Sequence, residues 1–187
     1  MQKRINFQNT KFLLSAAGSS QFLTDKPAVA FLGRSNVGKS SLINSLVYSN
    51  LMKTSKSPGV TKFVNYALVD NTFYIVDLPG YGYASGQGEQ FSSLFSEFIR
   101  SKNLKKIYLL VDSRRLLLPA DADFIDYLNK EKIPFSIIFT KSDKLNSSDK
   151  HFLALQKEKL GDANFFDCSI KIQKSIESIR KDIIQSI

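Results

Sequence analysis

The sequence predicts a three-layer α/β fold in which a mostly parallel six-stranded sheet, with one antiparallel strand, has helices on both faces. Two observations lead to this prediction. Short apolar runs alternate with segments of helical periodicity along the 187-residue chain, which is typical of parallel strands joined by helices. Two consecutive β-rich runs are separated by only a short polar turn, so these two strands are expected to form a hairpin.

The first part of the chain contains a buried strand, a helix, the hairpin and a second helix. The strand AVAFL ends at a glycine-rich loop, and SSLINSL after it places Leu42, Ile43 and Leu46 on one helical face. The hairpin turns at Asp70-Asn71, between NYALVD and TFYIVD. The strands are predicted at 28–32, 65–70 and 72–77, the helices at 40–46 and 90–101, and loops at 50–62 and 78–88.

The second part of the chain continues this alternation and closes with an amphipathic helix. The strands are predicted at 106–112, 134–140 and 164–169, and the helices at 120–130 and 147–160. The closing helix has an apolar face made of Ile172, Ile176, Ile179 and Ile183.

One domain is predicted for residues 28–187, after an N-terminal extension at 1–27 in which KFLLSAA (11–17) is a candidate edge strand. The single cysteine, Cys168, excludes an internal disulfide and a four-cysteine metal site and fits a reducing compartment. No apolar run approaches ~20 residues, and the N-terminus lacks the apolar core of a signal peptide. We therefore expect a cytoplasmic monomer with no membrane partner.

The charge balance favours a polyanionic partner. The net charge is +9, from 26 Lys and Arg against 17 Asp and Glu. A solvated basic surface is the alternative interpretation. The basic residues are dispersed and accompany no aromatic RNA-binding motif. Charge alone therefore suggests a nucleic-acid partner without identifying it, and DNA is not expected.

Residues 33–40 match the phosphate-binding pattern G-x-x-x-x-G-K-[ST] between a buried strand and a helix. The two glycines let backbone N–H groups surround phosphates, and the helix N-terminus adds partial positive charge. Lys39 is expected at the β- and γ-phosphates and Ser40 at Mg²⁺. The candidate binding residues are Gly33, Arg34, Ser35, Asn36, Val37, Gly38, Lys39, Ser40 and Ser41, with Ser41 expected mainly to pack at the helix start.

The segment DLPG follows the second hairpin strand and comprises Asp77, Leu78, Pro79 and Gly80. A carboxylate at a strand end can hold Mg²⁺ through water, and the N–H of Gly80 can contact a γ-phosphate. The pattern D-x-x-G is common in turns. Here, however, the pattern follows the phosphate-binding loop at this distance and comes after a hairpin. This placement favours a role in contacting Mg²⁺ and the γ-phosphate over a simple turn.

The polar segment SPGVT (57–61) is the candidate switch between these two motifs. Thr61 is our choice for a second Mg²⁺ ligand that senses the γ-phosphate, and Thr54 is the competing choice. The candidate nucleotide contacts in this segment are Gly59, Val60, Thr61, Lys62 and Phe63. The candidate metal ligands are thus Ser40, Thr61 and Asp77, and the candidate catalytic residues are Lys39, Thr61 and Asn36.

Two later segments select guanine. In TKSD (140–143), the Asp143 carboxylate can accept hydrogen bonds from guanine N1–H and N2–H₂, a donor pair that adenine lacks. The Lys141 stem can cover the base, and Thr140 replaces the asparagine of N-K-x-D with a shorter polar group. Backbone N–H groups of DCSIK (167–171) can contact guanine O6, while the Cys168 side chain is expected to be buried and unreactive. The candidates are Thr140, Lys141, Ser142, Asp143, Asp167, Cys168, Ser169 and Ile170.

The ordered set GRSNVGKSSLIN, TSKSPGVT, VDLPGYGYA, LLVDSRR, TKSDKL and CSIK resembles the EngB (YsxC or YihA) family of Era-like bacterial GTPases, over nearly the whole chain. The resemblance implies a G domain that acts as a Mg²⁺-dependent GTP/GDP switch. It also implies a precursor of the large (50S) ribosomal subunit as partner, and a role in cell division and growth. The chain departs from the family pattern at Val60, where arginine is usual, and at Cys168, where serine is usual.

The residue after DLPG is Tyr81, where Ras-like enzymes have a glutamine that orients water. Slow intrinsic hydrolysis, accelerated by a partner or a cation, is therefore expected. The side-chain carbonyl of Asn36 could help hold K⁺ beside the phosphates, or Asn36 could simply tolerate a left-handed backbone. A P-loop kinase, which does not explain TKSD, and a pure binding module are the alternative classes.

Overall fold

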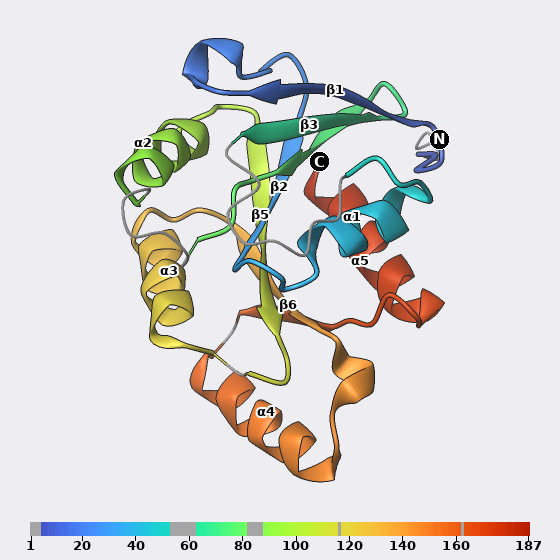
Figure 1. Cartoon of the computed structure of the whole chain (residues 1–187), viewed down its shortest axis with the longest axis vertical. Helices are drawn as coiled ribbons and strands as arrows, with labels where there is room; N and C mark the ends of the chain where they lie inside the picture. The colour runs from blue at the N-terminus through green and yellow to red at the C-terminus, as the bar shows by residue number, and fades with distance from the viewer. Residues whose placement is uncertain (1–4, 53–62, 82–87, 116, 162) are drawn as a thin grey trace.

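The computed structural model describes residues 5–52, 63–81, 88–115, 117–161 and 163–187, with the backbone alone for 88–92. It contains a seven-stranded sheet in the order β1-β3-β4-β2-β5-β6-β7, with helices around it (Figure 1). The strands are β1 Thr10–Ala16, β2 Ala28–Gly33, β3 Val64–Val69, β4 Phe73–Asp77, β5 Leu104–Asp112, β6 Phe135–Thr140 and β7 Asn164–Asp167. The helices are α1 Lys39–Val47, α2 Gly88–Ile99, α3 Pro119–Lys130, α4 Ser147–Lys159 and α5 Gln173–Ser186, with short 3-10 turns η1 Ser19–Gln21 and η2 Ser142–Lys144.

Strand β3 is antiparallel to both of its neighbours, β1 and β4, while β4, β2, β5, β6 and β7 run parallel. The β3–β4 hairpin turns where it was predicted. Asp70 and Asn71 have φ angles of 47° and 55°, the left-handed backbone that a tight hairpin turn requires. The seventh strand, β1, comes from the N-terminal segment and places Thr10 opposite Val69.

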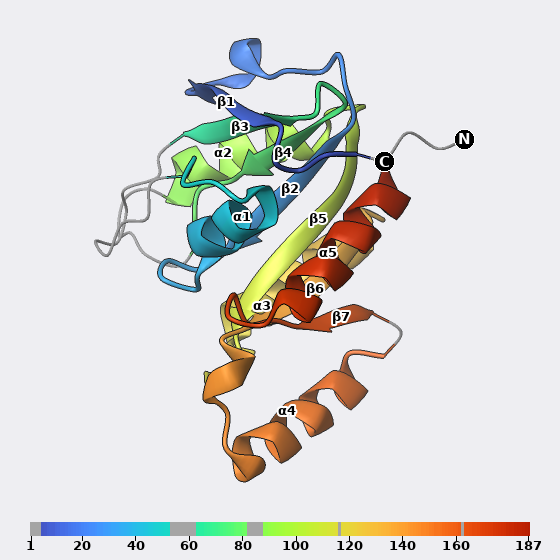
Figure 2. The same cartoon turned by 90° about the vertical axis from the view of Figure 1, so that its right-hand side faces the viewer.

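The sheet lies between two helical layers, as the predicted α/β class requires. Helices α1 and α5 cover one face, where Leu42 and Ile179 are fully buried. Helices α2, α3 and α4 contribute Phe98, Leu128 and Leu153 to the opposite face. Figure 2 shows α1 and α5 on the same side of the sheet.

Strand β7 ends at Asp167, two residues before the predicted end at Ser169. The reason lies in the next hydrogen bonds. The Cys168 carbonyl accepts from the N–H of Ser142 at 3.1 Å, and the N–H of Ser169 donates to Ser175 Oγ at 3.2 Å. The chain therefore leaves the sheet to contact η2 and α5.

The parallel strands bring the predicted motifs together at one edge of the sheet. The segments after β2, β4, β5, β6 and β7 all begin at the carboxyl ends of neighbouring parallel strands, which is where α/β sheets bind ligands. Within the described ranges, no helix is long and apolar enough to cross a membrane.

Candidate functional site

The phosphate-binding loop joins β2 to α1 and is tightly packed at its start. A Cβ on Gly33 would lie 2.8 Å from the Leu110 carbonyl oxygen and 2.9 Å from Val37 Cγ1, so only glycine fits there. Asn36 and Gly38 have φ angles of 64° and 101°. Gly38 is the N-cap of α1, and its carbonyl accepts the N–H of Leu42 at 2.9 Å. The loop therefore ends at a helix N-terminus, the arrangement that binds phosphate.

Lys39 and Asp77 bring the first two motifs into contact. The Lys39 ammonium forms an ion pair with Asp77 Oδ1, and their side chains are only 9% and 3% exposed. A lysine that can contact phosphate thus lies beside a carboxylate at the end of β4. Ser40 follows Lys39 in the first turn of α1. The hydroxyl of Ser40 and the carboxylate of Asp77 are hard oxygen donors of the kind that Mg²⁺ prefers, so this donor set fits the ion.

The DLPG segment lies directly against the phosphate-binding loop. The N–H of Leu78 donates to the Phe31 carbonyl at 3.0 Å, which extends the contact between β4 and β2. A Cβ on Gly80 would lie 3.1 Å from the Gly33 carbonyl oxygen and 3.2 Å from the Ser35 nitrogen. Glycine thus allows the close approach of Gly80, after Pro79, to the loop. This places the Gly80 backbone beside the residues expected to surround the phosphates.

Tyr81 is fixed in the core by helix α3. Its hydroxyl donates to Asp121 Oδ1 at 2.6 Å, and its ring stacks on Phe124 with centroids 5.2 Å apart. Burial, followed by the charge of Asp121, raises the pKa of the Tyr81 hydroxyl. The side chain that stands where Ras-like enzymes have glutamine is therefore engaged with α3.

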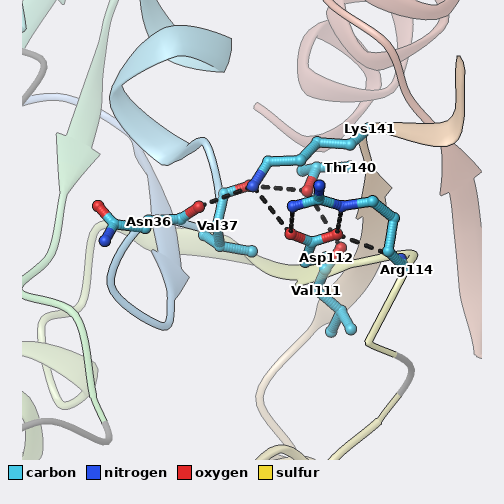
Figure 3. A network of polar contacts seen from close by, with 7 residues as sticks. All are labelled: Asn36, Val37, Val111, Asp112, Arg114, Thr140 and Lys141. Carbon is cyan, nitrogen blue, oxygen red and sulfur yellow. Dashed lines mark hydrogen bonds and ion pairs between the residues drawn. The ribbon is translucent and has the colours of Figure 1, made fainter. Parts of the chain in front are cut away.

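The TKSD segment is bound to the phosphate-binding loop through its first two residues (Figure 3). Thr140 Oγ1 donates to the Val37 carbonyl at 2.7 Å, so the threonine bonds the loop despite its short side chain. The Lys141 ammonium donates to the Asn36 carbonyl at 2.8 Å. This places the aliphatic stem of Lys141 next to the loop, where it can cover a base.

Asp143 lies in η2 and faces the segment that follows β7. Its carboxylate is 3.3 Å from the ammonium of Lys171. A hydrogen bond with Ser169, together with one to Lys171, lowers the pKa of Asp143. The carboxylate is therefore ionised at neutral pH, as a group that accepts hydrogen bonds from guanine must be.

The segment 167–171 offers fewer free backbone donors than the sequence indicated. The N–H of Cys168 donates to the Phe139 carbonyl at 2.9 Å, and that of Ser169 is used by Ser175. The N–H groups of Cys168 and Ser169 are therefore already used within the fold, and contact between backbone N–H groups of residues 167–171 and guanine O6 remains a prediction. Among the described residues, the N–H of Ile170 has no partner and remains available. Asp167 pairs instead with Lys157 at 2.7 Å.

Asp112 is a site residue that the sequence reasoning missed. Its carboxylate accepts hydrogen bonds from Lys141 at 2.8 Å and from Arg114 at 2.7 and 2.9 Å (Figure 3). Desolvation opposes ionisation, but these cationic donors outweigh it and lower the pKa of Asp112. Asp112 ends β5 as Asp77 ends β4, so a carboxylate at the end of a buried strand was the available signal.

The remaining candidates are placed as follows. Val37 is buried, Ser41 is half-buried in α1, and Phe63 is exposed before β3. The candidate switch residues Gly59, Val60, Thr61 and Lys62, and the competitor Thr54, lie outside the described residues. The structure therefore brings together the phosphate-binding loop, DLPG, TKSD and the segment after β7.

Comparisons with known proteins agree with this geometry. Residues 28–141 match a protein family described as 50S ribosome-binding GTPase. A "Probable GTP-binding protein EngB" of Caldanaerobacter subterraneus is 42% identical over 151 residues, covering 78% of each chain. One of the same name from Flavobacterium johnsoniae is 36% identical over 187 residues, covering 95% of this chain and 89% of its own.

Solved structures show the same fold. A crystal structure of a probable GTP-binding protein engB has a TM-score of 0.63 and 27% identity, covering 85% of this chain and 97% of its own. Era, in complex with MgGDPNP and nucleotides 1506–1542 of 16S ribosomal RNA, has a TM-score of 0.64. At 21% identity, with 88% of this chain and 57% of Era covered, that likeness concerns the fold alone.

Fold and site together define a P-loop GTPase, an enzyme that binds guanine nucleotide and hydrolyses GTP. Within that class, the chain belongs to the EngB family of GTP-binding proteins. The resemblance inferred from the ordered motifs is thus confirmed, and a ribosome-related role follows from the matched family.

Proposed function

We propose that this GTPase is a Mg²⁺-dependent switch that acts in assembly of the large ribosomal subunit in the cytoplasm, as a monomer, and supports growth and division. The observation that carries the proposal is the convergence of four segments on one sheet edge. Lys39 contacts Asp77, Gly80 approaches the phosphate-binding loop, and Lys141 holds the same loop from the base side.

Each group has a chemical task in this proposal. Lys39 neutralises phosphate charge, while Ser40 and Asp77 hold Mg²⁺ directly or through water. Mg²⁺ supplies charge neutralisation at the phosphates. For Lys39 to contact phosphate, its ion pair with Asp77 must open or be shared, so nucleotide binding is expected to rearrange this pair. Thr61 remains our proposed second ligand.

Intrinsic hydrolysis is expected to be slow. The Tyr81 side chain, directly after Gly80, donates its hydroxyl hydrogen to Asp121 and is therefore not free to orient water. We therefore propose that a ribosomal surface or a cation completes the catalytic arrangement.

The test is co-sedimentation with precursors of the large subunit. The protein loaded with a non-hydrolysable GTP analogue should associate with 50S precursors, and the GDP-loaded protein should associate more weakly. The matched control is Lys39→Ala, which should lose both nucleotide binding and the nucleotide-dependent part of the association. Failure of the wild-type protein to associate under any nucleotide would contradict the proposal.

A further inference from the structure

A cleft opens between the phosphate-binding loop and the segment that follows β5. Its volume is about 180 Å³. The walls contain four cationic side chains and two carboxylates, together with buried or half-buried apolar residues. The charged lining residues are Arg34, Asp112, Arg114, Arg115, Asp121 and Lys141.

Both carboxylates are occupied within the walls of the cleft. Asp112 pairs with Lys141 and Arg114. Asp121 accepts one hydrogen bond from the Tyr81 hydroxyl at 2.6 Å and another from the N–H of Leu118 at 2.9 Å. Neither carboxylate forms an ion pair with Arg34 or Arg115, the other two cations of the lining.

Arg34 and Arg115 have no ion-pair partner among the described residues. In the ranges that the structure describes, neither guanidinium group has an ion pair or a hydrogen bond. Arg34 is half-buried and Arg115 is exposed, so one side chain lines the wall and the other is open to solvent. Partial burial of the Arg34 guanidinium without a partner is unfavourable, so an anion beside it is stabilised, and the exposed Arg115 can supply a second guanidinium group from the solvent side.

The chemistry of the cleft favours a phosphate over an acidic protein segment. Guanidinium groups bind phosphate through two parallel hydrogen bonds, and a phosphate group fits the volume. Protein-binding hot spots are built around apolar and aromatic anchors. None of the large exposed apolar side chains of the described residues lines this cleft. The net charge of +9 further favours a polyanion.

We propose that this cleft binds a backbone phosphate of ribosomal RNA, with Arg115 and Arg34 as the contacting residues. The inference rests on the proposed association with the large subunit and assigns a contact surface to it. Since residues 34–37 belong both to the cleft and to the phosphate-binding loop, the RNA phosphate lies beside the nucleotide site. RNA contact and nucleotide state can then influence each other through one loop.

The test compares two charge reversals, Arg115→Glu in the cleft and Lys150→Glu on α4. Lys150 is also exposed and has no ion pair among the described residues. Association of the analogue-loaded proteins with purified large subunits is measured across a range of KCl concentrations. For Arg115→Glu we expect at least about tenfold weaker association and a slope of log K against log[salt] that is smaller by about one. Arg115→Lys should retain most of the slope, and Lys150→Glu should behave as wild type.

Equal affinity and slope for Arg115→Glu and wild type would overturn the cleft assignment while leaving the proposed function intact. An equal loss in Lys150→Glu would also overturn it, because the effect would then be one of general charge. Absence of wild-type association would remove both proposals. Binding of a fluorescent GDP analogue, measured for every variant, shows whether the nucleotide site is preserved.

A second arm uses deproteinised ribosomal RNA of the large subunit. Arg115→Glu should weaken this association and reduce its salt slope in the same direction, because the bound group is a phosphate. A loss confined to intact subunits, with unchanged binding to the RNA alone, would overturn the proposal in favour of an acidic ribosomal protein.

Discussion

The ammonium of Lys141 donates a hydrogen bond of 2.8 Å to the carboxylate of Asp112, which joins the end of β6 to the end of β5. The same ammonium donates to the Asn36 carbonyl at 2.8 Å. Lys141 is thereby held between two fixed acceptors. The geometry makes Asp112 a positioning residue for the side chain that is expected to cover the guanine base.

Asp112→Asn should release bound GDP faster, by about tenfold, since a hydrogen bond to a charged group contributes about 1.5–3 kcal/mol. Stopped-flow displacement of a fluorescent GDP measures the rate. The matched control is Asp182→Asn, which loses the bonds to Lys106 at 2.8 Å and Tyr108 at 2.6 Å at a different part of the fold. We expect both variants to be destabilised to a similar extent, but only Asp112→Asn to release GDP faster than wild type. If Asp112→Asn and Asp182→Asn released GDP at the same rate, the positioning role of Asp112 would be contradicted.

Asp112 also sets a pH dependence. Because its pKa is lowered in the folded protein, its ionised form stabilises the fold above the unfolded value of about 3.9, and this contribution is lost as the pH falls below it. The difference in unfolding free energy between wild type and Asp112→Asn should therefore be constant from pH 7 to 5 and shrink toward pH 3. Urea titrations at each pH measure this difference in unfolding free energy. A difference that already shrinks between pH 7 and 5 would contradict a lowered pKa of Asp112.

Asp143→Asn should change the base preference from guanine to xanthine. The amide replaces one acceptor by a donor, which complements the xanthine carbonyl and leaves a guanine donor unpaired. We expect GDP affinity to fall by about 10²-fold or more while XDP affinity rises. Equilibrium titration with both nucleotides measures this, with Asp126→Asn on the exposed face of α3 as the control. Retained guanine preference would show that Asp143 does not contact the base.

Substitutions at Asn36 can distinguish a role of its backbone conformation from a role of its side chain in binding a cation. Its φ of 64° shows that the left-handed backbone is adopted, and this does not exclude a second task for its side chain. We expect GTP hydrolysis to be about tenfold faster in KCl than in NaCl. Asn36→Gly keeps the backbone freedom and removes the amide, so it should lose the KCl effect as Asn36→Ala does. Equal wild-type rates in the two salts would end the potassium hypothesis.

Arg180 secures the C-terminal end of α1 from helix α5. Its guanidinium donates to the carbonyls of Leu46 at 2.8 Å and Ser45 at 2.6 Å and to the Tyr48 hydroxyl at 2.7 Å. It also stacks on the Tyr48 ring at 3.9 Å. Arg180→Ala should lower the free energy of unfolding by about 2–4 kcal/mol, because helix carbonyls lose a charged donor.

Urea unfolding measures this loss, with Lys181→Ala, at the next and exposed position, as a control expected to remain near wild type. Arg180→Lys should recover only part of the stability, since one ammonium cannot reproduce the planar donor set. Full recovery by lysine would show that charge alone is responsible.

Cys168 should be chemically inert in the folded protein. Burial raises the pKa of its thiol to about 11, so only about one molecule in a thousand carries the thiolate at pH 8. Labelling by iodoacetamide should be slow at pH 8 and become fast when urea unfolds the chain. Because the folded pKa is raised, the thiol favours folding below its unfolded pKa and this contribution is lost as the pH rises toward 11. Rapid native labelling would contradict the buried position.

The helices, the strands and the positions of the motifs were predictable because each depends on residues that are close together in the sequence. The strand before Gly33, the hairpin turn at Asp70-Asn71 and the buried Ile176, Ile179 and Ile183 of α5 follow from periodicity and turn chemistry. The inclusion of Ile172 in that apolar face was wrong, because Ile172 is the exposed N-cap of α5. The phosphate-binding loop, DLPG and TKSD each follow a strand, and parallel topology places their starts at one edge.

The features of the site that could not be predicted depend on contacts between segments that are distant in the sequence. Asp112 and Lys141 are separated by 29 positions, and only the β5–β6 pairing brings them together. The use of the Cys168 N–H by Phe139 depends on where β7 leaves the sheet. The direction of Tyr81 depends on Asp121 in α3, which a motif pattern does not contain.

The contact between Arg180 and the end of α1 has a consequence for the order of folding. The helix that begins at the phosphate-binding loop is completed by a side chain 134 positions later in the chain. Contacts of such sequence separation form late, because a long loop must close first. During synthesis from the N-terminus, the segment with the phosphate-binding pattern is therefore made well before Arg180, the residue that stabilises the end of its helix. The hydrogen bonds that complete the end of α1 therefore become possible only once α5 has been synthesised.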